Sequence, residues 1–162
     1  MIRACIFDMD GTIADTLASI AGFGNEALTA CGYQPIPVQE YRTLVGNGAD
    51  TLMRRMLTFT AGSFTEEDVA RVRAVYDKAY GSDPMRQVTE YAGMRQTLLY
   101  MKEHGLKLAV FSNKPDDMTQ QVAQHLYPGL FHAVRGQQDG IPLKPSPEGA
   151  LLLAKELGVS PK

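Results

Sequence analysis

The sequence predicts an α/β fold, in which helices cover a parallel sheet and a small helical domain is inserted. Three short apolar stretches, 2–7, 106–111 and 131–135, have the length and composition of buried strands. Helical patterns alternate with these stretches, which favours parallel strands joined by right-handed crossovers. The region 16–85 interrupts the alternation, because it contains helical patterns and no convincing strand.

Each helix is expected where apolar residues recur every three or four positions and a capping or breaking residue marks an end. Gly32 ends a first helix that begins near Thr16. The helix at 65–80 opens with Thr-Glu-Glu-Asp, which places acids where the helix dipole favours them. Helices are expected at 16–30, 38–45, 49–60, 65–80, 93–104 and 116–126, and from 144–148 up to 157. We expect residues 1–15 and 86–162 to form the core and residues 16–85 the helical domain.

The composition is that of an ordinary globular protein, with 162 residues, of which 44% are hydrophobic and 21% charged. A formal net charge of −2 gives no basic surface, so neither nucleic acid nor a membrane is an expected partner. No apolar run approaches the roughly 20 residues of a membrane span, and no signal peptide is visible. Cys5 and Cys31 make no disulfide framework. We therefore expect a cytoplasmic protein with free thiols.

The candidate chemistry centres on Asp8 and Asp10, which follow the first predicted strand. Residues two apart in an extended segment point the same way, so both carboxylates project together while Met9 turns away. Carboxylates this close repel each other unless a cation or a shared proton relieves them. The pair suits a nucleophile beside an acid/base, with a divalent cation held by oxygen ligands. An ordinary Asp-Gly turn, with Gly11 as its flexible residue, is the alternative interpretation.

Polar residues near the ends of the other predicted strands belong to the same edge of the sheet. Ser112 follows the second strand, and Lys144 lies in the loop after the third. Parallel sheets bind ligands at the carboxyl ends of their strands. Taken alone, Ser112 would be a helix cap and Lys144 a solvated lysine. Their register with Asp8 and Asp10 favours one shared site.

These motifs resemble those of the haloacid dehalogenase superfamily of phosphohydrolases. Asp-Met-Asp-Gly-Thr at 8–12 is similar to the first motif, Val-Phe-Ser-Asn-Lys at 110–114 to the second, and Leu-Lys-Pro-Ser-Pro at 143–147 to the third. The helical region between the first two motifs resembles the family's small cap. Within the superfamily the likeness is to phosphoglycolate phosphatases, through 112–114, Tyr-Ala-Gly at 91–93 and Leu-Val-Gly-Asn-Gly-Ala at 44–49. The resemblance implies a Rossmann-like core.

The resemblance also implies a phosphomonoester hydrolase that acts through an aspartyl-phosphate intermediate. Asp8 would attack phosphorus, and Asp10 would protonate the leaving group and then activate water. Mg²⁺ would be held by the Asp8 side chain and the Asp10 backbone carbonyl, with water and substrate completing the octahedron. The residues that would hold the phosphoryl oxygens are Thr12, Ser112, Asn113 and Lys144.

The expected cap site lies at Gly46-Asn47-Gly48, where backbone donors before a helix suit a substrate carboxylate. Arg54 or Arg42 is the expected charge-assisted partner of that carboxylate. A plain turn and solvated arginines are the alternative. The resemblance implies a small phosphorylated metabolite such as 2-phosphoglycolate as the substrate.

Dehalogenase and sugar phosphomutase are two other activities that occur on this fold. Dehalogenases of this fold lack the second aspartate, which is present here as Asp10. A sugar phosphomutase would use the same two aspartates, so it remains an alternative.

The sequence departs from the family pattern in its last part. The fourth motif is a Gly-Asp followed by a further acid, which supplies the remaining metal carboxylates, and this chain contains no Gly-Asp. The family's sheet places the first strand beside the strand that carries this motif. We therefore expect an N-terminal portion of a phosphatase, with an exposed sheet edge open to self-association. A non-catalytic remnant that binds phosphate-bearing ligands, or assembles through that edge, is the alternative.

Overall fold

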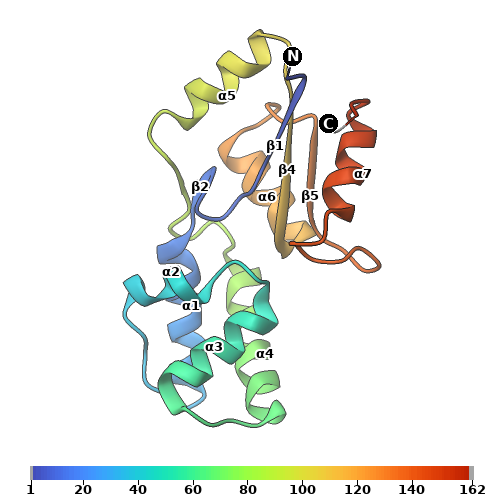
Figure 1. The fold of residues 1–162 in the computed structure, drawn as a ribbon. Coiled ribbons are helices and arrows are strands. Elements are labelled where there is room, and N and C mark those ends of the chain that lie inside the picture. Colours follow the sequence, from blue (N-terminus) through green and yellow to red (C-terminus); the bar gives the residue numbers. More distant parts are fainter. Residues whose placement is uncertain (1, 161–162) are drawn as a thin grey trace. The chain divides into compact units, whose positions relative to one another are not determined.

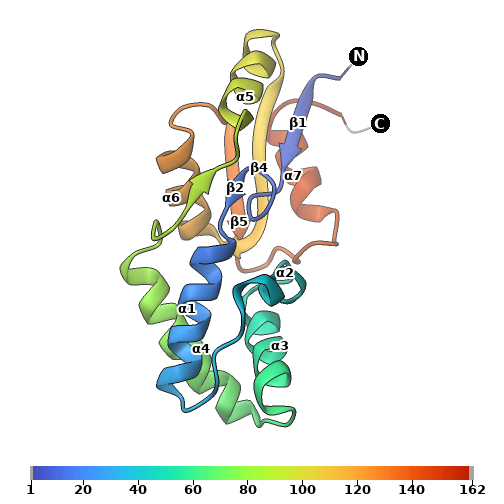
Figure 2. The same ribbon diagram turned by 90° about the vertical axis from the view of Figure 1, so that its left-hand side faces the viewer.

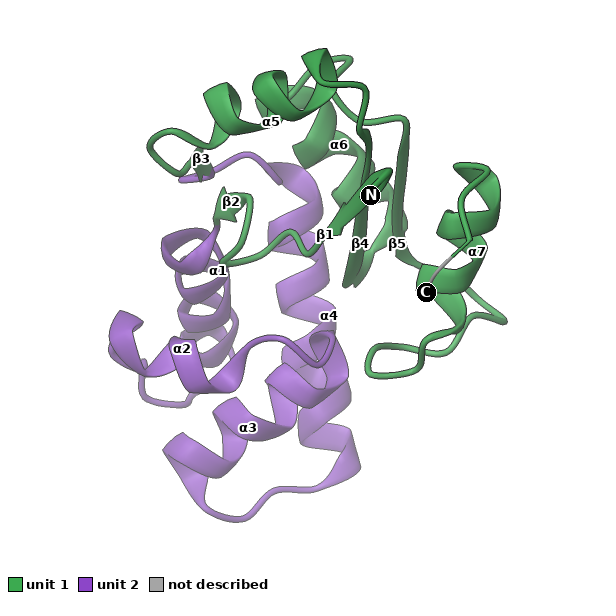
Figure 3. Ribbon diagram, turned by 45° about the horizontal axis from the view of Figure 1, so that its top comes forward, with its two compact units in different colours: residues 1–15, 89–162 green, residues 16–88 purple. Residues whose placement is uncertain are grey.

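The computed structural model describes residues 2–160, which divide into two compact units (Figure 3). Unit 1 combines the residues up to Asp15 with those from Thr89 onward, and unit 2 is Thr16–Val88. The sequence placed the second boundary at 85/86, whereas the helical unit continues to Val88, whose side chain is buried. No helix among residues 2–160 combines the length and the apolar character that a membrane span requires.

Unit 1 is built on a three-stranded parallel sheet, which confirms the predicted fold class. Its strands are β1 (Ala4–Phe7), β4 (Lys107–Pro115) and β5 (Ala133–Gln137), in the order β1-β4-β5. Helices α5 (Met94–Glu103), α6 (Asp116–Leu126) and α7 (Glu148–Glu156) follow the predicted crossovers. Helices α6 and α7 lie on opposite faces of the sheet (Figures 1 and 2).

The core of unit 1 depends on the central strand. Leu108, Ala109 and Val110 are fully buried in β4, as expected for a parallel strand covered on both faces. On the α7 face, the Phe111 ring lies against Gly149, where an added Cβ would come within 2.2 Å of the ring. The absence of a side chain at Gly149 therefore lets α7 approach the sheet at this point.

Strand β4 is longer than its apolar run predicted. The run ends at Phe111, yet the strand continues to Pro115 and includes the buried polar residues Ser112, Asn113 and Lys114. Its pairing with β5 shifts register between Phe111 and Pro115. Burial of these three polar residues indicates that their side chains have partners inside the unit, because unpaired buried polar groups are costly.

A short antiparallel ribbon was not anticipated from the sequence. It joins β2 (Ala14–Asp15) to β3 (Thr89–Glu90), with Ala14 opposite Glu90. Two-residue strands are too short for any hydrophobic periodicity, so pattern analysis has no means of finding them.

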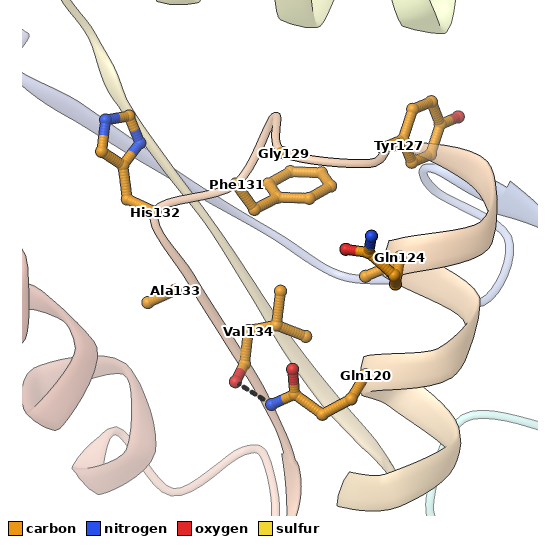
Figure 4. A pocket seen from close by; sticks show the side chains of 9 residues that line it. Gln120, Gln124, Tyr127, Gly129, Phe131, His132, Ala133 and Val134 are labelled. Atoms are coloured by element: carbon orange, nitrogen blue, oxygen red, sulfur yellow. Dashed lines mark hydrogen bonds between the residues drawn. The ribbon is translucent and has the colours of Figure 1, made fainter.

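The outer edge of β5 is covered in part by side chains of α6. Gln120 donates from Nε2 to the Val134 carbonyl at 2.6 Å (Figure 4), and the Gly136 N–H donates to Asp116 Oδ1 at 2.7 Å. These bonds occupy backbone groups with which another strand would pair. The pocket beside them, which Gln124 and His132 help to line, contains none of the predicted site residues. Strand β1, at the other edge, pairs only with β4 among residues 2–160, so self-association there stays a prediction.

The elements of unit 2 that the structure describes are all helical. It contains α1 (Leu17–Ala30), a 3-10 turn η1 (Val38–Glu40), α2 (Tyr41–Leu44), α3 (Ala49–Ala61) and α4 (Glu66–Ser82). Leu52, Met53, Met56 and Leu57 of α3 are buried and recur at helical spacing, so they form the face of α3 that packs in the core of unit 2. Gly24 of α1 is required by close packing, because a Cβ there would lie 2.5 Å from the Tyr41 hydroxyl oxygen.

Helix α4 begins with a capping box around Asp68. Thr65 accepts the Asp68 N–H at 3.2 Å, and Asp68 Oδ2 in turn accepts the Thr65 N–H at 2.9 Å. Asp68 Oδ1 accepts bonds from the Tyr33 hydroxyl and from Arg71, both at 2.8 Å. Hydrogen bonds from Thr65 are the main cause that lowers the Asp68 pKa to about 2.

The capping box predicts how unfolding depends on pH. Because the folded-state pKa of Asp68 lies below its ordinary value of 3.8, its stabilisation is present above about pH 4 and is lost as the pH falls toward 2. Asp68→Asn should therefore lower the melting temperature at pH 6, and the difference from wild type should shrink toward pH 2. Thermal unfolding followed by circular dichroism measures both. Glu67→Gln, in the same helical turn, is the matched control, and an unchanged difference across this pH range would contradict the prediction.

Candidate active site

Asp8 and Asp10 lie in a tight loop directly after β1. The Met9 carbonyl accepts the N–H groups of Thr12, Ile13 and Ala14, each at 3.1 Å, so the chain reverses within a few residues. Gly11 has φ 78°, a left-handed conformation that glycine adopts without steric cost.

Within this loop the side chains alternate as predicted. Met9 is fully buried, whereas the side chains of Asp8 and Asp10 are 45% and 20% exposed. The loop therefore presents both carboxylates at the carboxyl end of β1, where Asp8 Oδ1 also accepts the Met9 N–H at 2.7 Å.

Each carboxylate is paired with its own lysine. Lys144 Nζ lies 2.7 Å from Asp8 Oδ1, and Lys114 Nζ lies 2.9 Å from Asp10 Oδ1 and 3.2 Å from Oδ2. The two negative and two positive charges therefore balance within a few ångströms. This arrangement relieves the repulsion expected from the sequence, and it does so with ammonium groups of the chain itself.

Asn113 fixes the backbone that carries Lys144. Its Oδ1 accepts the Lys144 N–H at 2.8 Å, and its Nδ2 donates to the Lys144 carbonyl at 3.1 Å. Lys144 Nζ also donates to the Phe111 carbonyl at 3.0 Å, and the Lys144–Pro145 peptide bond is cis. The second and third sequence motifs are thus joined directly by hydrogen bonds.

The other predicted phosphate ligands have different surroundings. Ser112 is 2% exposed, and its hydroxyl accepts the Lys114 N–H at 3.2 Å. Thr12 is exposed in the loop after Asp10. The structure therefore joins Asp8, Lys144 and Asn113 in one set of contacts. Asp10 belongs to a second set, in which Lys114 contacts Asp10 and Ser112. Phosphate binding by any of these residues stays a prediction.

A buried tyrosine supports the loop from behind. The Tyr127 hydroxyl, at the end of α6, donates to the Ile13 carbonyl at 2.6 Å, and both residues are buried. Burial is the main cause that raises the Tyr127 pKa to about 12, and the neighbouring Glu90 carboxylate contributes. Tyr127 therefore remains a neutral donor throughout the ordinary pH range.

The predicted cap residues lie in unit 2. Gly46 and Gly48 have φ of 109° and 83°, which favour glycine, and Gly48 caps the start of α3. Arg54 forms a two-bond ion pair with Glu66, at 2.6 Å for each bond.

The neighbouring Arg55 is the arginine that contacts the loop itself. It donates to the Leu44 carbonyl and to Asn47 Oδ1, both at 2.9 Å. The predicted role of Arg54 toward substrate is untested by these contacts.

Three residues in these networks were missed as functional candidates. Lys114 is two positions from Ser112 in an extended strand, and this spacing was the available signal, since such residues share a face. Arg55 and Tyr127 gave no comparable signal, because an arginine on a helix and a tyrosine at a helix end are common surface and core residues. Arg55 contacts Asn47, which is 8 positions away in the sequence, and Tyr127 contacts Ile13, which is 114 positions away. Local sequence patterns do not reveal such contacts.

The oxygen atoms of Asp8 and Asp10 are of the chemical type that binds a hard divalent cation. Carboxylate and carbonyl oxygens are the ligands that Mg²⁺ prefers, and Asp8 and Asp10 supply both types. Among residues 2–160 no group of three or more His, Cys, Asp or Glu side chains has the geometry of a metal site. Within this range, Asp8 and Asp10 are the residues that would contribute oxygens to such an ion.

Comparison with known proteins identifies the family. A family model of haloacid dehalogenase-like hydrolases matches residues 2–162. The chain belongs to this family. Phosphoglycolate phosphatase 1 of Pseudomonas aeruginosa is 29% identical to this chain, over 99% of this chain and 60% of that protein. The phosphoglycolate phosphatase of Salmonella typhi is 30% identical, over 99% of this chain and 71% of that protein.

Solved structures share the fold of this chain. A Lactobacillus delbrueckii protein, provisionally assigned as a phosphoglycolate phosphatase, superimposes with a TM-score of 0.93 at 30% identity, over 98% of this chain and 74% of that one. The β-phosphoglucomutase of Clostridium difficile has a TM-score of 0.76 at 27% identity, over 98% and 72%. The chain spans 60%, 64% and 58% of the length of three curated relatives.

The Tyr127 contact predicts a specific loss of stability. Tyr127→Phe removes the donor and leaves the buried Ile13 carbonyl without this partner, so the free energy of unfolding should fall by about 1–3 kcal/mol. Urea denaturation measures the change. Tyr100→Phe, at an exposed position of α5, is the matched control and should leave stability within the experimental error. Equal stabilities for Tyr127→Phe and wild type would show that the bond contributes nothing.

Proposed function

We propose that this hydrolase cleaves small phosphomonoesters with Mg²⁺, through an aspartyl-phosphate formed on Asp8. The observation that carries the proposal is the contact between Asp8 and Lys144, which lies beside the contact between Asp10 and Lys114. The proposed nucleophile and acid/base, which share one loop, thus meet lysines from two other stretches of the chain. Phosphoryl transfer depends chiefly on such positioning and charge stabilisation.

Asp8 is oriented for attack by its contacts. Both the Met9 N–H and Lys144 Nζ bind Oδ1, at 2.7 Å each, so the proposal assigns the attack to Oδ2. Oδ2 forms a bond to phosphorus as the bond from phosphorus to the alkyl oxygen breaks. Division of hydrolysis into this step and a second, hydrolytic step lowers the barrier of each.

Asp10 transfers the protons in both steps. In the first, Asp10 has taken up a proton from solvent before the substrate reacts, and its carboxyl gives this proton to the leaving alkyl oxygen and becomes a carboxylate. In the second, its carboxylate takes a proton from a water molecule that attacks phosphorus, and the bond from phosphorus to Asp8 Oδ2 breaks to release phosphate. Proton transfer by a positioned side chain contributes typically ~10²–10⁴-fold to rate.

Lys144, Ser112, Asn113 and Thr12 are proposed to bind the phosphoryl group. Lys144 is the most direct candidate, because its ammonium lies beside the nucleophile and its side chain is 28% exposed. Mg²⁺, when bound at Asp8 and Asp10, would neutralise charge on the phosphoryl oxygens. An ammonium and a cation together would let a phosphate dianion approach a carboxylate nucleophile.

The proposed substrate is a small phosphorylated acid such as 2-phosphoglycolate. Support comes from the names of the relatives in Pseudomonas aeruginosa and Salmonella typhi. Within unit 2, the loop at Gly46-Asn47-Gly48 is held by Arg55 and precedes α3, which suits recognition of a carboxylate by backbone N–H groups. We assign that role to this loop, with Arg54 as the candidate charged partner.

Metal dependence is the first test of this function. Purified protein with Mg²⁺ should release inorganic phosphate from 2-phosphoglycolate, and EDTA should abolish the release until excess Mg²⁺ is added. A panel of sugar phosphates assayed in parallel, with product analysis for phosphate shifted within the sugar, distinguishes a hydrolase from a mutase. Phosphate release that is insensitive to EDTA would refute the metal assignment, and no release from any ester would refute the proposed function.

The nucleophile is tested by one substitution and its control. Asp8→Asn keeps the shape of the side chain but removes the charge, so kcat should fall by roughly 10³-fold or more. Asp117→Asn, in the first turn of α6, is the matched control because that acid is exposed and lies outside the site. Acid-quenched protein from a reaction with ³²P-labelled ester should carry label in the wild type and in Asp117→Asn, but not in Asp8→Asn. Near wild-type turnover in Asp8→Asn would show that another group attacks phosphorus.

A further inference from the structure

Lys114 has an environment unlike that of an ordinary lysine. Its side chain is 4% exposed, and its ammonium contacts both oxygens of Asp10, at 2.9 and 3.2 Å. Burial of a charged group is costly unless an opposite charge and hydrogen bonds compensate it. An apolar side chain at this position would avoid the desolvation cost of a buried ammonium. The contact with Asp10 compensates that cost at the carboxyl edge of the sheet.

The backbone at Lys114 is held from both sides. Its N–H donates to Ser112 Oγ at 3.2 Å, and its carbonyl accepts a bond from Thr119 Oγ1 at 3.2 Å. Gly136 of β5 packs against the same carbonyl, where an added Cβ would lie 2.5 Å from the oxygen. Lys114 thus extends from a fixed point of β4, and Asp10 extends from the tight loop after β1.

The two lysines of the site differ in a way that suggests different roles. Lys144 and its partner Asp8 are 28% and 45% exposed, whereas Lys114 and Asp10 are 4% and 20% exposed. An exposed ammonium can exchange a carboxylate for the phosphoryl oxygens of a bound substrate at low cost. A buried ammonium that contacts both carboxylate oxygens instead fixes the plane of that carboxylate.

We propose that Lys114 is a positioning residue that orients the Asp10 carboxyl group for proton transfer, an inference that rests on the proposed function. Proton transfer requires heavy atoms within hydrogen-bond reach, and small displacements of the acid reduce the rate steeply. Lys114 remains with Asp10 through the reaction, while Lys144 binds the phosphoryl group. Lys114 acts through Asp10 and does not touch the reacting phosphorus.

The test compares esters that differ in how much acid assistance they need. An alkyl ester such as 2-phosphoglycolate leaves as a basic alkoxide and depends on the proton of Asp10, whereas p-nitrophenyl phosphate has a good leaving group and depends on it little. Lys114→Met should lower kcat/KM by roughly 10–100-fold for 2-phosphoglycolate, and by a much smaller factor for p-nitrophenyl phosphate. Lys114→Arg, which keeps the charge, should recover part of the alkyl-ester activity.

Matched controls separate positioning from general damage. Lys155→Met, on the exposed side of α7, should leave kcat/KM for both esters unchanged. Melting temperatures of all variants report whether the fold is intact. Equal losses for the two esters in a folded Lys114→Met would overturn the proposal, because a structural defect affects both substrates alike.

A second measurement does not depend on turnover or on the folding of Lys114→Met. A buried, bonded lysine ammonium exchanges its protons slowly and gives a ¹⁵N–¹H signal that exposed lysines lack. Wild type should show such a signal, Lys114→Arg should lack it, and Asp10→Asn should shift or broaden it. A signal that Asp10→Asn leaves unchanged, or no signal in wild type, would overturn the pairing on which the proposal depends. If wild type hydrolyses neither ester, the proposed function fails, and this measurement still decides whether Lys114 holds Asp10.

Discussion

The structure of unit 1 depends on how it accommodates two carboxylates at the end of one strand. Asp8 and Asp10 project from the same side of the loop after β1, and two like charges at that spacing repel each other. Lys144 and Lys114 each neutralise one of them at 2.9 Å or less. Because these lysines belong to the second and third motifs, the pairing also ties the ends of the sheet to the first loop.

Close packing behind the site holds the same elements in position. Gly149 allows Phe111 of β4 to contact α7, and Gly136 allows β5 to approach the Lys114 carbonyl. Tyr127 binds the Ile13 carbonyl, so the loop that carries Asp8 and Asp10 is supported by α6 as well as by β4. The candidate site is therefore built on rigid elements, as a reaction that depends on positioning requires.

Much of the candidate site was predictable because parallel strands end at a common edge. Asp8, Asp10 and Lys144 were placed together on that ground, and the structure joins Lys144 directly to Asp8, while Asp10 contacts Lys114. Lys114 was not assigned a role, since the apolar run ends at Phe111 and gives no sign that the strand continues beyond it. Arg55 was not distinguished from Arg54 because adjacent arginines on a helix look alike until their partners are known, and the role of Arg54 toward substrate stays a prediction.

The sequence by itself determined the α/β class, the helical insertion and the chemical character of the first loop. Hydrophobic periodicity and the strand-end position of Asp8 and Asp10 are local properties, and local pattern is sufficient to find them. Only the tertiary structure decided which lysine meets which carboxylate and which of the two pairs is buried. Those choices depend on contacts between residues 104 or more positions apart, and no local pattern encodes them.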